Sequence, residues 1–169
     1  ELMVFPRQGL QGMRYFSFNH YLRERFGEKV RRISLNPGFP CPNDESTRCI
    51  YCNENAFSDL AGTKVPLREQ IETAIEGMKN SSGASRFMAY FQNATGTNAG
   101  VEGLRRAYDT VKAYPEIVAM SIATRPDCVD AEKLDLISGY MPGLEVWIEY
   151  GLQSVHESSL KAIRRGHTH

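Results

Sequence analysis

The chain has 169 residues, of which 41% are hydrophobic and 24% are charged, as in ordinary globular proteins. This length suffices for one domain with a sizeable core and is too short for two comfortable ones. Twenty Lys and Arg residues balance twenty Asp and Glu residues, so the overall charge predicts no electrostatic attraction to nucleic acid. No apolar run approaches the roughly 18 residues of a membrane-spanning helix, and no secretory signal is visible. We therefore expect a cytoplasmic protein that does not contact a membrane.

The first segment, residues 1–29, is predicted to be an N-terminal extension with one amphipathic helix. Phe18, Leu22 and Phe26 recur at four-residue spacing, which places them on one face of a helix over residues 15–26. The chain begins with Glu1 rather than Met, so we expect an N-terminus that is incomplete or processed.

The core domain is predicted to cover residues 30–169, where short β-rich runs alternate with helical patterns. Strands are expected at residues 30–35, 86–91, 117–123 and 144–150, and helices at about 67–79, 101–113, 131–140 and 157–163, with a turn at 81–83. This alternation favours an α/β fold of parallel βα units. Four such strands are too few to close a barrel.

The unusual loops all follow predicted strands. They are the cysteine-containing loop and residues 92–98, 124–128 and 151–154. In parallel α/β sheets the functional groups gather at the carboxyl ends of the strands. We expect these four loops to converge on one edge of the sheet.

Three of the four cysteines form a C-x7-C-x2-C pattern, at Cys41, Cys49 and Cys52. A zinc site requires a fourth ligand, which Cys128 or a histidine would have to supply. A redox C-x-x-C pair would leave Cys41 without a role. An iron–sulfur cluster with one open iron uses all three thiolates. From spacing alone, both the cluster and a zinc-stabilised α/β binding module without catalysis stay open.

Short motifs along nearly the whole chain carry a family resemblance. They occupy residues 15–22, 26–30, 33–35, 38–39, 41–43, 89–92, 124–128, 151–154 and 164–168, and Tyr51 stands two residues after the middle cysteine. In this order they resemble the YhcC-type branch of the radical S-adenosylmethionine (SAM) enzymes, an uncharacterised, elongator-like branch. The resemblance covers the N-terminal part of such proteins.

The resemblance implies a fold and a chemistry. The fold would be an incomplete (β/α)6 TIM-like partial barrel, truncated after about four strands, with its C-terminal part missing. Cys41, Cys49 and Cys52 would hold a [4Fe–4S] cluster that reductively cleaves SAM to a 5′-deoxyadenosyl radical for hydrogen abstraction. An electron donor such as flavodoxin or ferredoxin would be a partner. Kinship with the elongator catalytic subunit suggests a tRNA wobble uridine as substrate, and the fragment itself is expected to turn SAM over poorly.

The resemblance also implies residues for binding SAM. The loop after the second strand, with Gln92 and Thr95, would accept hydrogen bonds from the SAM amino group. Arg165 would bind the SAM carboxylate, because a guanidinium fork suits bidentate binding. Arg165 follows Gln153 by twelve residues, a spacing similar to that in related SAM sites, and Gln153 would bind further polar atoms of SAM.

Two more residues complete the predicted SAM site. Thr124 would bind polar atoms at the end of the third strand, where related families place a Glu at the position of Ala123. Glu149 lies within an apolar strand, so it is expected either in the SAM or substrate cavity or in a salt bridge to Arg125. Cys128 is expected to be a packed free thiol near this mouth.

Overall fold

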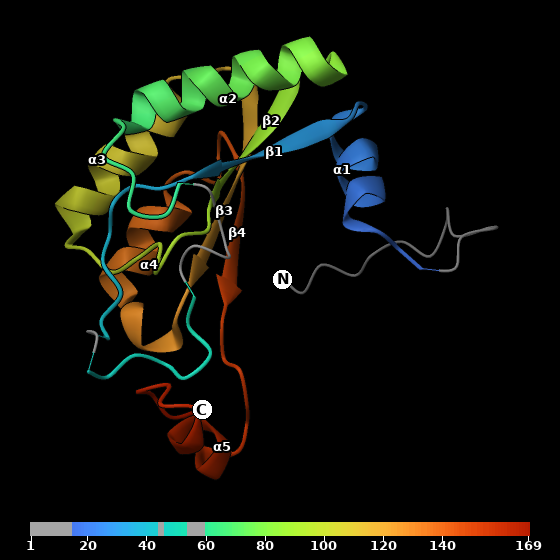
Figure 1. The fold of residues 1–169 in the computed structure, drawn as a ribbon. Helices are drawn as coiled ribbons and strands as arrows, with labels where there is room; N and C mark the ends of the chain where they lie inside the picture. The colour runs from blue at the N-terminus through green and yellow to red at the C-terminus, as the bar shows by residue number, and fades with distance from the viewer. Residues whose placement is uncertain (1–14, 44–45, 54–59) are drawn as a thin grey trace.

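The computed structural model describes residues 15–43, 46–53 and 60–169 (Figure 1). Residues 1–14 of the predicted N-terminal extension lie outside these ranges, as do residues 44–45 within the cysteine loop.

The centre of the molecule is a parallel β-sheet. It contains β1 (Val30–Leu35), β2 (Arg86–Phe91), β3 (Ile117–Thr124) and β4 (Glu145–Tyr150), in the spatial order β1-β2-β3-β4. All three pairings between neighbouring strands are parallel. The prediction of an α/β fold built from parallel βα units is therefore confirmed. Completion of a six-stranded barrel stays a prediction.

Helices connect the strands and cover the sheet. They are α2 (Leu67–Ser82), α3 (Val101–Lys112) and α4 (Ala131–Ser138), with α5 (Glu157–Ala162) after the last strand. Figure 1 shows α2, α3 and α4 on one side of the sheet and α1 (Phe18–Phe26) on the other. Across the part of the chain that the structure describes, no helix is long and apolar enough to cross a membrane.

The main hydrophobic core lies between the sheet and the helices α2, α3 and α4. Its members include Ile33, Phe87, Phe91, Met120 and Ile122 from the strands and Ile71, Leu104, Tyr108 and Ile137 from the helices. The contributing strand residues alternate along β1 and β2, since successive side chains point to opposite faces of a sheet. The opposite face is therefore left for α1 and for polar side chains.

Helix α1 packs on that second face at the amino-terminal end of the sheet. Leu22 is buried there with Val30, Met88 and Ala119. Trp147 of β4 makes edge-on ring contacts with Phe18 and Tyr21 of the helix, at 5.2 and 5.5 Å between ring centroids. The predicted amphipathic helix thus exists, and it covers the amino-terminal half of this face.

The end of α2 differs from the prediction. A turn was expected at residues 81–83, but the helix continues to Ser82. The hydroxyls of Ser81 and Ser82 donate to the carbonyls of Gly77 and Met78, at 2.7 Å each, so both side chains bond back to the preceding turn of the helix. Gly83, with φ of 60°, then ends the helix in the left-handed conformation.

Candidate functional site

A pocket of about 240 Å³ lies at the carboxyl ends of the strands. We call it the cysteine pocket. Its lining comprises Cys41, Asn43, Arg48, Cys49, Tyr51, Cys52, Gln92, Ala94, Ala123, Arg125, Gln153 and Arg165. The structure therefore brings the three loop cysteines together with three of the residues predicted to bind SAM, namely Gln92, Gln153 and Arg165.

Two buried arginines stand beside the cysteine sulfurs. The Nη1 atom of Arg125 lies 3.9 Å from Cys41 Sγ, and that of Arg165 lies 3.9 Å from Cys49 Sγ. Arg125 is 2% exposed and Arg165 is 9% exposed. A guanidinium N–H can donate a hydrogen bond to a metal-bound thiolate and offset its negative charge. This environment suits anionic sulfur ligands.

Arg125 is held by a carboxylate and an amide. Its Nε and Nη2 atoms donate to the two carboxylate oxygens of Asp127 at 2.8 and 2.6 Å, and its Nη1 donates to Asn43 Oδ1 at 2.7 Å. Burial acts to lower the pKa of Arg125, but the hydrogen bond and charge of Asp127 outweigh it and raise that pKa. Burial likewise acts to raise the pKa of Asp127, and Arg125 reverses the effect and lowers it.

Arg165 has a different set of partners. Its Nη2 donates to the carbonyl of Gly151 at 2.8 Å, and its Nε donates to His167 Nε2 at 3.1 Å. Within the described ranges, no carboxylate pairs with it. A Cβ atom at Gly151 would lie 3.0 Å from both Arg165 Nη2 and Gln153 Nε2, so these two side chains pack closely against this glycine. Arg165 is thus a buried cation that lines the pocket and can receive an external carboxylate.

Glu149 binds neighbours on the face of the sheet opposite the main core. Its two carboxylate oxygens accept from Tyr90 Oη at 3.1 Å and from Ser121 Oγ at 2.5 Å. Burial, followed by the charge and hydrogen bond of Glu149, raises the pKa of Tyr90. The predicted alternative of a Glu149–Arg125 salt bridge is wrong, because Asp127 occupies the fork of Arg125.

A second pocket, of about 260 Å³, adjoins the first and contains Glu149 and Thr124 in its lining. The two pockets share Ala94, Ala123, Arg125 and Arg165, so Glu149 and Thr124 lie close to the cysteine pocket without lining it. The Thr124 hydroxyl is already hydrogen-bonded to that of Thr97, at 2.6 Å.

Thr95 is placed differently from the prediction. It is fully buried, lines neither pocket, and its hydroxyl has no hydrogen-bond partner in the described parts of the chain. The next residue explains its position, since Gly96 packs so tightly that a Cβ there would lie 2.8 Å from Ile122 Cγ2. The loop lies against β3, and the Thr95 side chain is therefore buried in the interior.

Backbone strain accompanies the pocket. Ala94 and Gln153 both line it and have φ values of 51° and 71°, in the left-handed region that non-glycine residues seldom adopt. Such residues persist where the surrounding structure enforces them, commonly at binding sites. No sequence signal marks Ala94 as strained.

Cys128 lies in the short turn after β3 and is buried. It is 4% exposed and does not line the cysteine pocket. Burial and the charge of Asp127 raise the pKa of its thiol to about 11. The prediction of a packed free cysteine agrees with this position. In residues 15–43, 46–53 and 60–169, no three His, Cys, Asp or Glu side chains converge closely enough to hold one metal ion.

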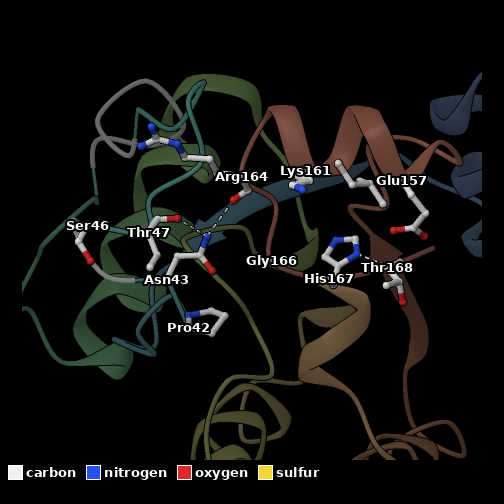
Figure 2. Close-up of a pocket in the computed structure, with 11 residues that line it drawn as sticks. Pro42, Asn43, Ser46, Thr47, Glu157, Lys161, Arg164, Gly166, His167 and Thr168 are labelled. Carbon is white, nitrogen blue, oxygen red and sulfur yellow. Dashed lines mark hydrogen bonds between the residues drawn. The ribbon is translucent and has the colours of Figure 1, made fainter.

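A third, open pocket of about 730 Å³ lies on the other side of the cysteine loop (Figure 2). It is lined by loop residues, including Pro42, Asn43 and Thr47, and by α5 and the residues after it, including Lys161, Arg164 and His167. Figure 2 shows Asn43 between the loop and the end of α5, with its amide donating to the carbonyls of Thr47 and Arg164. Asn43 lines both this outer pocket and the cysteine pocket, a placement that the sequence did not reveal.

Comparison with known proteins finds relatives named only as uncharacterised or by a bare label. The chain is 34% identical over 161 residues to an uncharacterised protein of Methanocaldococcus jannaschii, 36% identical over 162 residues to YtqA of Bacillus subtilis, and 39% identical over 155 residues to YhcC of Escherichia coli. These matches cover 93%, 91% and 89% of this chain. The chain spans about half the length of the curated relatives it matches. No family model matches it.

Proposed function

We propose that Cys41, Cys49 and Cys52 hold a [4Fe–4S] cluster and that the cysteine pocket binds SAM beside it. The observation that carries this proposal is the pocket itself, where three thiols and two buried arginines meet at the carboxyl ends of parallel strands. Ligands of α/β sheets bind at this edge.

The donor set favours a cluster over a single zinc ion. Zinc holds its sulfur ligands at about 2.3 Å, so four ligand atoms must converge on one point. Cys128, the remaining sulfur, does not line the cysteine pocket. A cluster distributes its cysteines over separate irons and so requires the sulfurs to surround a larger body. Three cysteines around one pocket suit that arrangement.

The residues around the sulfurs suit SAM, which carries a carboxylate and an amino group. The Arg165 guanidinium has no carboxylate partner in the described structure. Three of its five N–H groups contact His167, Gly151 and Cys49, which leaves two N–H groups for the SAM carboxylate. Gln92 and Gln153 supply amide oxygens for the amino group from the ends of β2 and β4. When bound, the cluster and SAM supply reductive cleavage and hydrogen abstraction, while the protein binds and orients both.

SAM binding to the reconstituted protein, measured by equilibrium dialysis, tests the proposal. Arg165→Gln should weaken binding at least tenfold, because a charge-assisted bond contributes about 1.5–3 kcal/mol. Arg164→Gln is the matched control, since this exposed neighbour lines only the outer pocket. Equal SAM affinity in wild type and Arg165→Gln would contradict the assignment of Arg165. Absence of SAM binding by a cluster-loaded wild type would contradict the function.

The substrate and the redox partner are predictions of the resemblance alone. A tRNA substrate predicts a gel shift that weakens steeply as salt rises, because phosphate contacts release counterions. Absence of a shift at low salt with a full-length relative would remove tRNA from consideration. If flavodoxin or ferredoxin is the donor, its reduced form should transfer one electron to the cluster. Bleaching of the cluster absorbance measures this transfer.

A further inference from the structure

A continuous series of contacts joins two of the proposed ligand sulfurs. The Nη1 atom of Arg125 lies 3.9 Å from Cys41 Sγ and donates to Asn43 Oδ1 at 2.7 Å. The Nδ2 atom of Asn43 in turn donates to Cys49 Sγ at 3.6 Å. We call Asn43 and Arg125 the sulfur bridge. It links the first and second cysteines of the loop, which are eight positions apart in the sequence.

Both members of the sulfur bridge are fixed by other contacts. Asp127 binds Arg125 through two hydrogen bonds, and the whole guanidinium is buried. Asn43 Nδ2 also donates to the carbonyls of Thr47, at 2.9 Å, and Arg164, at 3.3 Å (Figure 2). The bridge is therefore anchored to the cysteine loop, to the end of β3 and to the end of α5.

The amide of Asn43 faces more acceptors than it has hydrogens. Its Nδ2 carries two hydrogens, whereas three acceptors surround it: two backbone carbonyls and the Cys49 sulfur. Hydrogen bonds to an ionised acceptor are about twice as strong as neutral ones. A metal-bound thiolate at Cys49 would therefore strengthen the contact that is now the longest of the three.

We propose that Asn43 is a positioning residue that, with Arg125, spaces Cys41 and Cys49 and sets the reduction potential of the cluster. This inference rests on the proposed function. Hydrogen bonds to ligand sulfurs stabilise added negative charge, so they raise the reduction potential. Arg125 acts chiefly as a hydrogen-bond donor, because Asp127 balances its charge. Replacing the Asn43 amide therefore breaks the bridge without disturbing the ion pair between Arg125 and Asp127.

A redox titration of the reconstituted protein, followed by its visible absorbance, tests this role. Asn43→Leu has similar size and no donor, and it should shift the midpoint potential to a more negative value and speed loss of iron to a chelator. Asn43→Ser keeps one donor and should shift the potential less. Asn53→Leu is the matched control, because Asn53 is exposed, follows Cys52 directly and lines neither the cysteine pocket nor the outer pocket.

The outcomes separate the inference from the function on which it rests. Wild-type potential and iron retention in both Asn43 variants would overturn the positioning role alone. A wild-type chain that binds no iron and sulfide would overturn the cluster, and the inference with it. The role is also supported if Asn43→Leu keeps native circular dichroism but fails to bind the cluster, and Asn43→Ser binds it with a shifted potential.

Discussion

Arg125 and Arg165 are both buried beside a cysteine sulfur, yet they differ in what balances their charge. Asp127 neutralises Arg125, and its lowered pKa reflects that pairing. Arg165 contacts a carbonyl, an imidazole and the Cys49 sulfur, and it has no carboxylate partner in the described structure. A buried cation is costly unless it is paired. Arg165 is therefore the arginine that gains most from an anionic cluster or a carboxylate ligand.

The Arg125–Asp127 pair makes stability depend on pH. Asp127→Asn should lower the free energy of unfolding by about 2 kcal/mol at neutral pH, because Arg125 loses charged hydrogen bonds. The pKa of Asp127 is lowered on folding, so its contribution is complete above the ordinary value of about 4 and is lost as the pH falls through the folded value. Urea unfolding between roughly pH 3 and 7, a range that includes the ordinary pKa of about 4, measures both effects. A pH-independent difference between wild type and variant would contradict the assignment.

The thiol of Cys128 should react slowly. Its pKa of about 11 leaves only a small thiolate fraction near pH 8, and the side chain is buried. Iodoacetamide labelling of the native apo-protein, read by peptide mass spectrometry, should modify Cys41 and Cys52 well before Cys128. In urea the difference should disappear. Rapid labelling of Cys128 in the native state would show that it is accessible.

At the scale of elements, the sequence predicted the strands well and the end of one helix poorly. β1 and β2 match the predicted bounds, because short apolar runs between turn residues define a buried strand. The end of α2 was missed because Ser81 and Ser82 are common in turns, yet here their hydroxyls bond back to the helix. Back-bonding of this kind depends on rotamers that a sequence does not specify.

The loop after β2 depends on Gly96, which lets the chain approach β3. A Cβ at this position would lie 2.8 Å from Ile122 Cγ2 and 2.9 Å from the carbonyl of Ala123. Gly96→Ala should therefore destabilise the protein by about 1–3 kcal/mol. Gly77→Ala, in the exposed interior of α2 with nothing within 4 Å, should stabilise it by about 0.5–1 kcal/mol. Urea unfolding of the two variants checks the contrast, and equal effects would contradict it.

At the scale of the molecule, the candidate site joins segments far apart in the chain. The resemblance predicted Cys41, Cys49, Cys52, Gln92, Gln153 and Arg165, and all six line one pocket. Asn43 and Arg125 were not predicted as site residues, because their contact joins positions 82 residues apart and has no local pattern. Thr95 was predicted and is buried instead, since the packing of its loop depends on tertiary contacts.

The central claim is that three cysteines and not the fourth hold an iron–sulfur cluster. Iron and sulfide content after anaerobic reconstitution tests it most directly. We expect about four irons and four sulfides per wild-type chain, the same content in Cys128→Ala, and loss of the cluster in Cys41→Ala, Cys49→Ala and Cys52→Ala. One tightly bound zinc without sulfide, or a cluster that persists when the loop cysteines are replaced, would contradict the claim.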